Sequence, residues 1–179
     1  KYDNYNIEKE GISVDEKDIN IAYKECKKEL VLALEKAAER ISNFHEKQIP
    51  NNISYTDDNN VELASRWTPL DSVGLYVPGG KASYPSSVIM TAIPAKIAKV
   101  PEVSMCVPSP KGYLNPSVLV AAKICGVGNI YKIGGAQAIA AMAYGTNTIK
   151  RVNKIFGPGN AWVAEAKRQL FGKVGIDMV

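Results

Sequence analysis

The strongest constraint on the fold is a regular alternation of strand-like and helix-like segments that begins at Val73. Short runs rich in Val, Ile and Tyr, each closed by glycine or proline, are followed by longer runs with helical spacing. We expect strands at 73–77, 103–107, 129–133, 152–156 and 175–179. We expect helices at 86–97, 116–124, 136–144 and 160–170. Because the links are short, the strands should be parallel and joined by right-handed crossovers, as in a doubly wound, Rossmann-like α/β sheet.

The first third of the chain has a different character, rich in Lys, Glu, Asp and Asn. From Ile19 to Phe44, apolar residues recur at steps of three and four, which predicts one long amphipathic helix that ends before Pro50. Such a helix must bury its apolar face on the second region or on another subunit. We therefore expect a helical N-terminal segment over 1–68 and a Rossmann-like domain over 69–179.

Charge and cysteine usage exclude several classes of protein. The net charge of +4 is modest and scattered, whereas nucleic-acid binding requires a dense basic face. Three cysteines without a C-x-x-C pair predict free thiols in a reducing compartment. The first ten residues are polar and charged, and no apolar run approaches the roughly 20 residues needed to span a membrane. We expect a cytoplasmic protein that binds neither nucleic acid nor membrane.

Glycine-rich turns follow three of the expected strands, at 78–80, 134–135 and 157–159. In a parallel sheet these turns lie at the carboxyl edge, where ligands of open α/β sheets bind. Glycine lets backbone N–H groups approach a phosphate, and a helix N-terminus adds partial positive charge. Gln137 and Asn160 follow two of the turns. A side-chain amide is neutral and offers both donors and an acceptor, so it can hydrogen-bond to ribose hydroxyls or to a carboxamide. The pattern predicts a crevice for an anionic or nucleotide ligand.

Each turn also has a plainer explanation. Glycine is common in tight strand-to-helix turns, and Asn160 suits the N-cap of the following helix. Neither 126–131 nor 157–162 matches the dinucleotide fingerprint G-x-G-x-x-G, and the sequence contains no G-x-x-x-x-G-K-[ST] phosphate loop. The residues alone thus indicate an α/β domain with a ligand crevice, and a general anion- or phosphosugar-binding module stays open.

The same turns resemble the histidinol dehydrogenase family, and the order and spacing fit from about Pro69 to Met178. The matching runs are Val73 to Gly80, Tyr84 to Val88, Ile93 to Ala98, Gly134 to Ala140, Lys154 to Ala161 and Glu165 to Gln169. Each run is more specific than a lone glycine motif. The long helix before them is compatible with the family but not diagnostic.

The resemblance implies an NAD-dependent oxidoreductase of histidine biosynthesis. Family members oxidise L-histidinol to L-histidine through an aldehyde-level intermediate with two NAD molecules in turn, and they are zinc-dependent homodimers. By motif position, the family's NAD contacts fall on Tyr76, Gln137 and Asn160. Two of these residues agree with the crevice argument, and Tyr76 would offer a ring and a hydroxyl. Region 69–179 is then expected to be the nucleotide-binding domain.

The resemblance also implies that this chain contains no catalytic and no metal-binding residue. The family's zinc ligands, which include two histidines, and its Glu-His pair for proton transfer lie beyond Val179. His45 is the only histidine, and it reads as a solvated or helix-packing residue because position i+4 is Ile49. We expect the chain alone not to oxidise histidinol. The alternative is a truncated, non-catalytic remnant that folds but binds little NAD.

Overall fold

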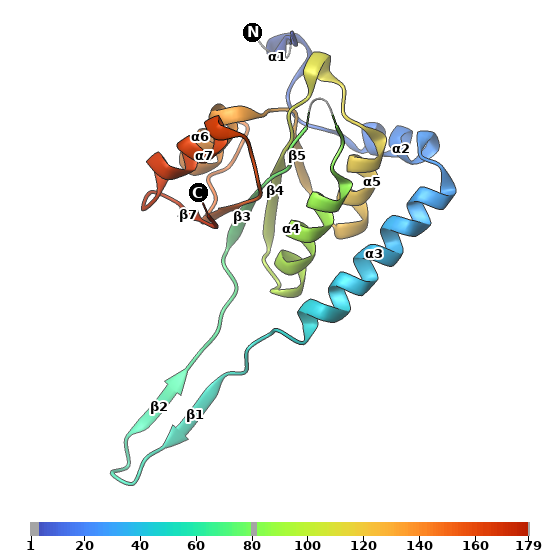
Figure 1. Ribbon diagram of the computed structural model, residues 1–179. Coiled ribbons are helices and arrows are strands. Elements are labelled where there is room, and N and C mark those ends of the chain that lie inside the picture. Colours follow the sequence, from blue (N-terminus) through green and yellow to red (C-terminus); the bar gives the residue numbers. More distant parts are fainter. Residues whose placement is uncertain (1–3, 80–81, 179) are drawn as a thin grey trace.

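A five-stranded parallel sheet forms the centre of the computed structural model, which describes residues 4–79 and 82–178 (Figure 1). Its strands are β3 (Ser72–Tyr76), β4 (Glu102–Cys106), β5 (Asn129–Tyr131), β6 (Lys154–Phe156) and β7 (Gly175–Ile176). They stand in the order β5-β4-β3-β6-β7, and every neighbouring pair is parallel. The predicted doubly wound α/β fold is confirmed.

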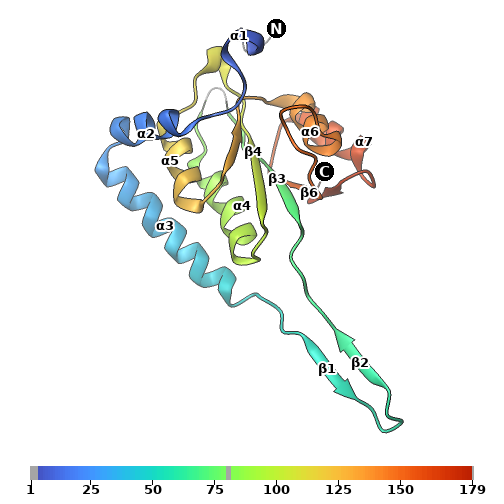
Figure 2. The ribbon, with the colours of Figure 1, turned by 180° about the vertical axis from the view of Figure 1, so that it is seen from behind.

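Helices cover both faces of the sheet (Figures 1 and 2). The helices are α4 (Pro85–Ile97) and α5 (Pro116–Cys125) on one face, and α6 (Gly135–Tyr144) and α7 (Ala161–Leu170) on the other. Successive strand residues point to opposite faces. Leu75 therefore belongs to the core beneath α4 and α5, whereas its neighbour Tyr76 belongs to the core beneath α6 and α7.

The single long helix expected from Ile19 to Phe44 is wrong. The segment forms two helices, α2 (Glu16–Glu25) and α3 (Lys28–Glu46), separated by extended backbone at Cys26 and Lys27. Helix α2 packs on α5, whereas α3 packs across α4 and α5. A change of direction lets both apolar stripes reach one core, and this tertiary contact outweighs the local preference for a continuous helix.

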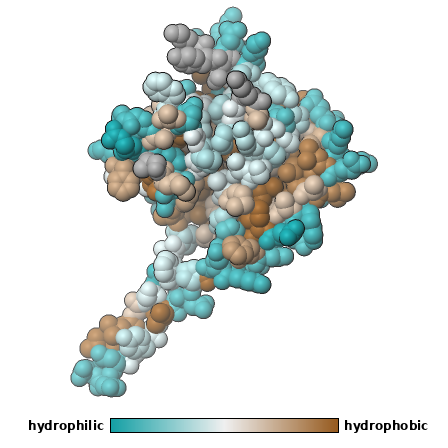
Figure 3. Space-filling view, in the orientation of Figure 1, coloured by the Kyte–Doolittle hydropathy of each residue, from teal (hydrophilic) through white to brown (hydrophobic). Residues whose placement is uncertain are grey.

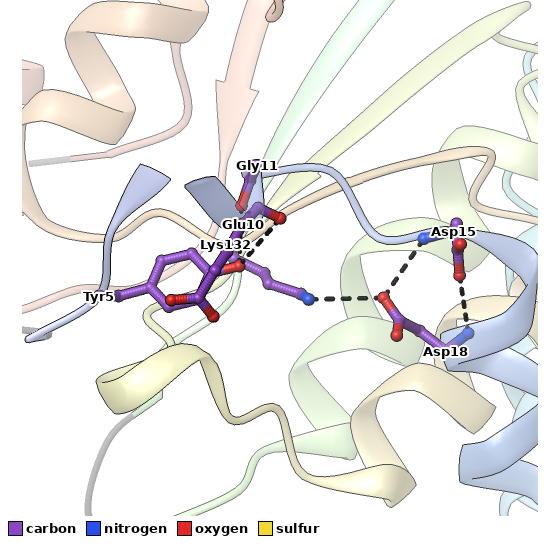
Figure 4. A network of polar contacts seen from close by, with 6 residues as sticks. All are labelled: Tyr5, Glu10, Gly11, Asp15, Asp18 and Lys132. Carbon is purple, nitrogen blue, oxygen red and sulfur yellow. Dashed lines mark hydrogen bonds and ion pairs between the residues drawn. The ribbon is translucent and has the colours of Figure 1, made fainter. Parts of the chain in front are cut away.

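The residues before α2 cover the free edge of β5. The N–H of Val14 donates to the carbonyl of Ile130 over 2.9 Å. Asp15 then caps α2 in a capping box with Asp18, and the Lys132 ammonium lies 3.4 Å from the Asp18 carboxylate (Figure 4). These contacts protect an edge strand that would otherwise expose unpaired backbone groups.

A two-stranded antiparallel hairpin, β1 (Ile53–Thr56) and β2 (Glu62–Ser65), extends away from the sheet and its helices (Figure 1). Every residue in both strands is exposed. The Asp57 carboxylate accepts hydrogen bonds from the N–H groups of Asn59 and Val61, which closes the turn. The sequence analysis missed this hairpin, because the four-residue strands have no buried face to impose a clear alternation.

The other predicted strands and helices are present, with changes at their ends. Helix α4 is one helix with Pro94 in its interior. Strands β5, β6 and β7 are shorter than expected, and β7 ends at Ile176. Val179, at the end of the last expected strand, lies outside the described residues. The two short elements are α1 (Ile7–Glu10) and the 3₁₀ turn η1 (Pro110–Gly112). Within the described ranges, no helix has the length and apolar character needed to cross a membrane.

Candidate functional site

The candidate site lies where the sheet changes winding direction. Strands β3 and β6 are neighbours, with Leu75 opposite Phe156. The chain leaves β3 toward α4 on one face and leaves β6 toward α7 on the opposite face. The two connections diverge and open a crevice at the carboxyl edge, which is the usual ligand position in open α/β sheets.

The turns at this edge pack against one another closely. Gly157 has a φ of +115°, and a Cβ on this residue would overlap the carbonyl of Tyr76. A Cβ on Gly134 would overlap the ring of Pro108, in the loop after β4. The plainer explanation of these two glycines therefore holds, because the turn packing requires them with or without a ligand. Gly80, the last glycine of the first turn, lies outside the described residues.

A hollow of about 620 Å³ opens between these turns. Its lining residues are Tyr76, Pro78, Gly79, Pro108, Pro110, Gly134, Gly135, Ala136, Gln137, Gly159, Asn160 and Trp162. Thus the structure brings the three predicted contact residues to one hollow. The residues that line it carry no formal charge, and they include the first residues of α6 and α7. The partial positive charge of two helix N-termini therefore favours an anionic group here.

Tyr76 forms part of the wall of this hollow. The residue is only 3% exposed and belongs to the core beneath α6 and α7. Its hydroxyl oxygen accepts a hydrogen bond of 3.0 Å from the N–H of Gly135, at the first turn of α6. Tyr76 therefore links the end of β3 to the start of α6, so that both its ring and its hydroxyl already have a structural role.

The two amides lie on exposed residues beside this wall. Asn160 is the N-cap of α7, and its Oδ1 accepts a hydrogen bond of 3.1 Å from the N–H of Val163. The cap function expected from sequence is therefore real, and it leaves the Nδ2 group to face other partners. Gln137 lies in the first turn of α6 and makes no side-chain hydrogen bond with the described residues.

Trp162 is a lining residue that the sequence analysis did not select. Its side chain is 75% exposed in the first turn of α7. A large exposed aromatic ring beside a hollow that carries a few polar groups is a common feature of ligand sites, because tryptophan offers apolar area and one N–H donor. The signal available in the sequence was a tryptophan two residues after a capping asparagine.

A larger hollow of about 850 Å³ shares Gly159 with the first. Its walls are mainly apolar and include Met90, Pro94 and Phe156. It contains no pair of converging amides. For a polar cofactor the smaller hollow is the better candidate, because a few placed polar groups, rather than size, give a site its specificity.

The cysteines and the histidine do not form a metal site. Cys26, Cys106 and Cys125 are free and buried. Burial raises the pKa of Cys106 to about 12 and that of Cys125 to about 11, which keeps both as thiols. His45 lies in the last turn of α3 with its ring edge against Phe44. Across residues 4–79 and 82–178, no three His, Cys, Asp or Glu side chains converge.

Comparison with known proteins places this geometry in a family. A family model described as histidinol dehydrogenase matches residues 1–179. The chain belongs to the histidinol dehydrogenase family. Histidinol dehydrogenase from Brucella abortus strain 2308 is 56% identical over 179 residues, which are the whole of this chain and 42% of the relative. Histidinol dehydrogenase 1 from Nostoc sp. strain PCC 7120 is 62% identical over 154 residues, or 86% of this chain and 36% of the relative.

A solved structure of the family has the same fold. The crystal structure of histidinol dehydrogenase from Elizabethkingia anophelis superposes with a TM-score of 0.89 at 39% sequence identity. The match covers 93% of this chain and 39% of that one. The chain therefore spans roughly two fifths of the length of these histidinol dehydrogenases, and the resemblance found in the sequence is confirmed.

Proposed function

We propose that the hollow at the switch point binds NAD and that this chain is the NAD-binding part of a histidinol dehydrogenase-type oxidoreductase. The reaction of the complete protein would be oxidation of L-histidinol to L-histidine. NAD, when bound, supplies the hydride acceptor for each of the two oxidations. The observation that carries the proposal is the convergence of Tyr76, Gln137 and Asn160 on one hollow from three separate turns.

The lining groups suit a dinucleotide. The N-termini of α6 and α7 border the hollow and favour a pyrophosphate. The Gln137 amide offers donors and an acceptor to ribose hydroxyls or to a carboxamide, and the Asn160 Nδ2 offers donors. Trp162 would supply apolar area beside a ring. A volume of about 620 Å³ is in the ordinary range for cofactor sites.

Calorimetric titration of the 179-residue chain with NAD tests the proposal. Replacing Gln137 with Ala should weaken NAD binding roughly fivefold, because one hydrogen-bonded amide is worth about 1 kcal/mol. Asn160→Ser should weaken it similarly, while the serine hydroxyl retains the cap of α7. Gln48→Ala removes an exposed amide beyond the end of α3 and should leave NAD affinity unchanged.

The other outcomes identify the alternatives. A folded chain that takes up no NAD would be a non-catalytic remnant. A chain that binds inorganic phosphate or a sugar phosphate, with no effect of Gln137→Ala or Asn160→Ser, would be a general anion-binding module. Either result would overturn the NAD assignment.

We further propose that the zinc ligands and the acid–base residues of the complete protein come from outside this chain. Zinc prefers converging thiolate, imidazole or carboxylate ligands. The residues present do not fit such a site, since Cys106 and Cys125 are buried thiols and His45 is the single histidine. No step of the reaction is therefore assigned to residues of this chain, which we expect to be inactive alone.

Assembly into a cytoplasmic homodimer is the last part of the proposal. Residues directly opposite in the hairpin share a face, so Ile53, Tyr55 and Leu63 form one apolar side, and each is more than 40% exposed. Brown hydrophobic atoms are visible on this arm at the lower left of Figure 3. An isolated two-stranded hairpin is marginally stable in water, so this apolar side suits a second copy of the chain.

A further inference from the structure

An ion pair between the buried Lys167 and the partly buried Asp177 contacts the turn that leads to Asn160. Lys167 lies in α7 and is 3% exposed, and Asp177 directly follows β7. The Lys167 Nζ and Asp177 Oδ1 atoms are 2.6 Å apart. Neither residue lines the hollow with Tyr76, Gln137 and Asn160, yet both reach the turn beside it.

The pair binds both polar groups of a single residue, Gly157. The N–H of Gly157 donates to Asp177 Oδ2 over 2.8 Å, and its carbonyl accepts from Lys167 Nζ over 2.6 Å. Asp177 Oδ1 also accepts from the N–H of Met178 over 2.8 Å. Two elements that are separate in sequence, α7 and the end of β7, therefore fix the orientation of the peptide groups on either side of Gly157.

This orientation matters because Gly157 approaches Tyr76 more closely than any other residue type could. A Cβ on Gly157 would overlap the Tyr76 carbonyl. Tyr76 in turn accepts a hydrogen bond from Gly135, two residues before Gln137. A rotation of the turn at Gly157 would therefore shift Asn160 relative to both other predicted contacts.

Stability alone does not account for an ion pair at this position. Desolvation of a lysine and a carboxylate offsets much of their attraction, and apolar replacements of buried pairs are often neutral or stabilising. Burial acts to raise the pKa of Asp177, but the hydrogen bonds from Lys167, Gly157 and Met178 outweigh it and leave the pKa below its usual value. The carboxylate is thus held ionised in contact with the turn.

We propose that Lys167 and Asp177 are positioning residues, which lock the Gly157 turn so that Asn160 and the N-terminus of α7 face the NAD hollow. The inference rests on the proposed function, because it concerns the same site. It predicts a role for two side chains that do not touch the cofactor. Substitution at either position should weaken NAD binding through the turn.

The test uses the 179-residue chain at a temperature where circular dichroism shows each variant folded. Asp177→Asn and Lys167→Met should each weaken NAD binding roughly ten- to hundredfold, the scale typical of a small misplacement of binding groups. Because both act through one turn, the double variant should bind no more weakly than the weaker single variant. Additive losses would contradict a shared clamp.

An exposed ion pair on the same helix supplies the matched control. Arg168 and Glu165 lie 2.6 Å apart, and neither bonds to Gly157. Glu165→Gln and Arg168→Met make the same changes of charge as the two test variants and should leave NAD affinity unchanged. Wild-type affinity in folded Asp177→Asn, or equal losses in the control variants, would overturn the positioning role.

A second readout separates this inference from the proposed function. Backbone amide hydrogen exchange at Gly157, Gly159 and Asn160, measured by NMR without NAD, should be faster in Asp177→Asn than in the wild type. If the wild-type chain binds no NAD, the proposed function fails, while this exchange still tests the clamp. If the wild type binds NAD and Gln137→Ala weakens it, but exchange at these three residues is unchanged in Asp177→Asn, only the clamp fails.

Discussion

At the scale of single residues, Gly157 is the position where adding one carbon atom should disturb the fold most. Its backbone lies at a φ of +115°, where L side chains are strained, and an added Cβ would overlap the Tyr76 carbonyl. Gly126, in contrast, has a φ of +80° at the end of α5 with open space around it. A substitution at Gly126 therefore measures backbone strain alone, whereas one at Gly157 measures strain and steric overlap together.

Replacing Gly157 with Ala should destabilise the fold by about 2–4 kcal/mol, because strain and overlap act together. Gly126→Ala should cost only about 1 kcal/mol, since only the left-handed backbone is penalised. Urea denaturation followed by circular dichroism measures both. Equal losses at the two positions would mean that the contact between the turn and Tyr76 carries no stability.

Asp177 should also make stability depend on pH. Its pKa is lower in the folded protein than the usual 3.8, so its stabilising contribution is fully present above that value. The contribution is lost as the pH falls through the folded-state pKa. Unfolding free energy measured between about pH 7 and about pH 3 should therefore fall less steeply in Asp177→Asn than in the wild type. Asp58→Asn, in the hairpin turn, should follow the wild-type curve.

At the scale of elements, the hairpin and the break between α2 and α3 are the features that sequence patterns did not reveal. The stripe of apolar residues from Ile19 onward has the right spacing for a helix, but its first half packs on α5 and its second half packs across both α4 and α5. The hairpin has the opposite problem, because its apolar side has no partner within the described chain and leaves no burial pattern. Both depend on contacts outside the segment itself.

The hairpin yields a prediction about assembly. If the proposed homodimer forms through the hairpin, threonine at Ile53, Tyr55 and Leu63 together should shift it to monomer in sedimentation velocity. The thermal unfolding of the sheet domain should stay the same. Threonine keeps a high strand propensity and removes the apolar side. Threonine on the opposite face of the hairpin, at Ser54, Glu62 and Ala64, should leave the dimer intact. Unchanged association in the first variant would exclude this face as the interface.

At the scale of the whole molecule, the hollow proposed to bind NAD is lined by uncharged residues, and none of them is an obvious general base. Oxidation of an alcohol requires a base near the working pH and a group that holds the oxygen. The hollow is lined by residues without formal charge, and His45 lies on α3, on the far side of α4 and α5. We therefore expect this chain to bind NAD and the rest of the complete protein to supply the residues that carry out the reaction.

The purified chain should bind NAD but should not reduce it when L-histidinol is added. Absorbance of NADH, followed with and without a zinc chelator, measures this directly. A positive signal that the chelator abolishes would show that a metal site exists within these residues. Thermal stabilisation by NAD in the same preparation is the internal control, because it proves that the crevice is intact.

The sequence by itself determined the α/β class, the parallel strands and the turns that meet at one edge. Local periodicity and glycine punctuation encode these features, since each depends on neighbours within a few residues. Gln137 and Asn160 could be selected as candidates for the same reason. Tyr76 was selected only through the resemblance to the histidinol dehydrogenase family, in the matching run that begins at Val73.

Only the tertiary structure decided how those candidates are held. Tyr76 is a buried link between β3 and α6, and Lys167 reaches across to Asp177 at the end of β7. The cap that Asn160 forms was, in contrast, expected from sequence. An ion pair between a buried lysine and a partly buried aspartate on separate elements gives no periodic pattern in the sequence, because the packing of the sheet and not local spacing brings its partners together. The bend after α2 and the exposed hairpin likewise depend on which other surface packs against each apolar face.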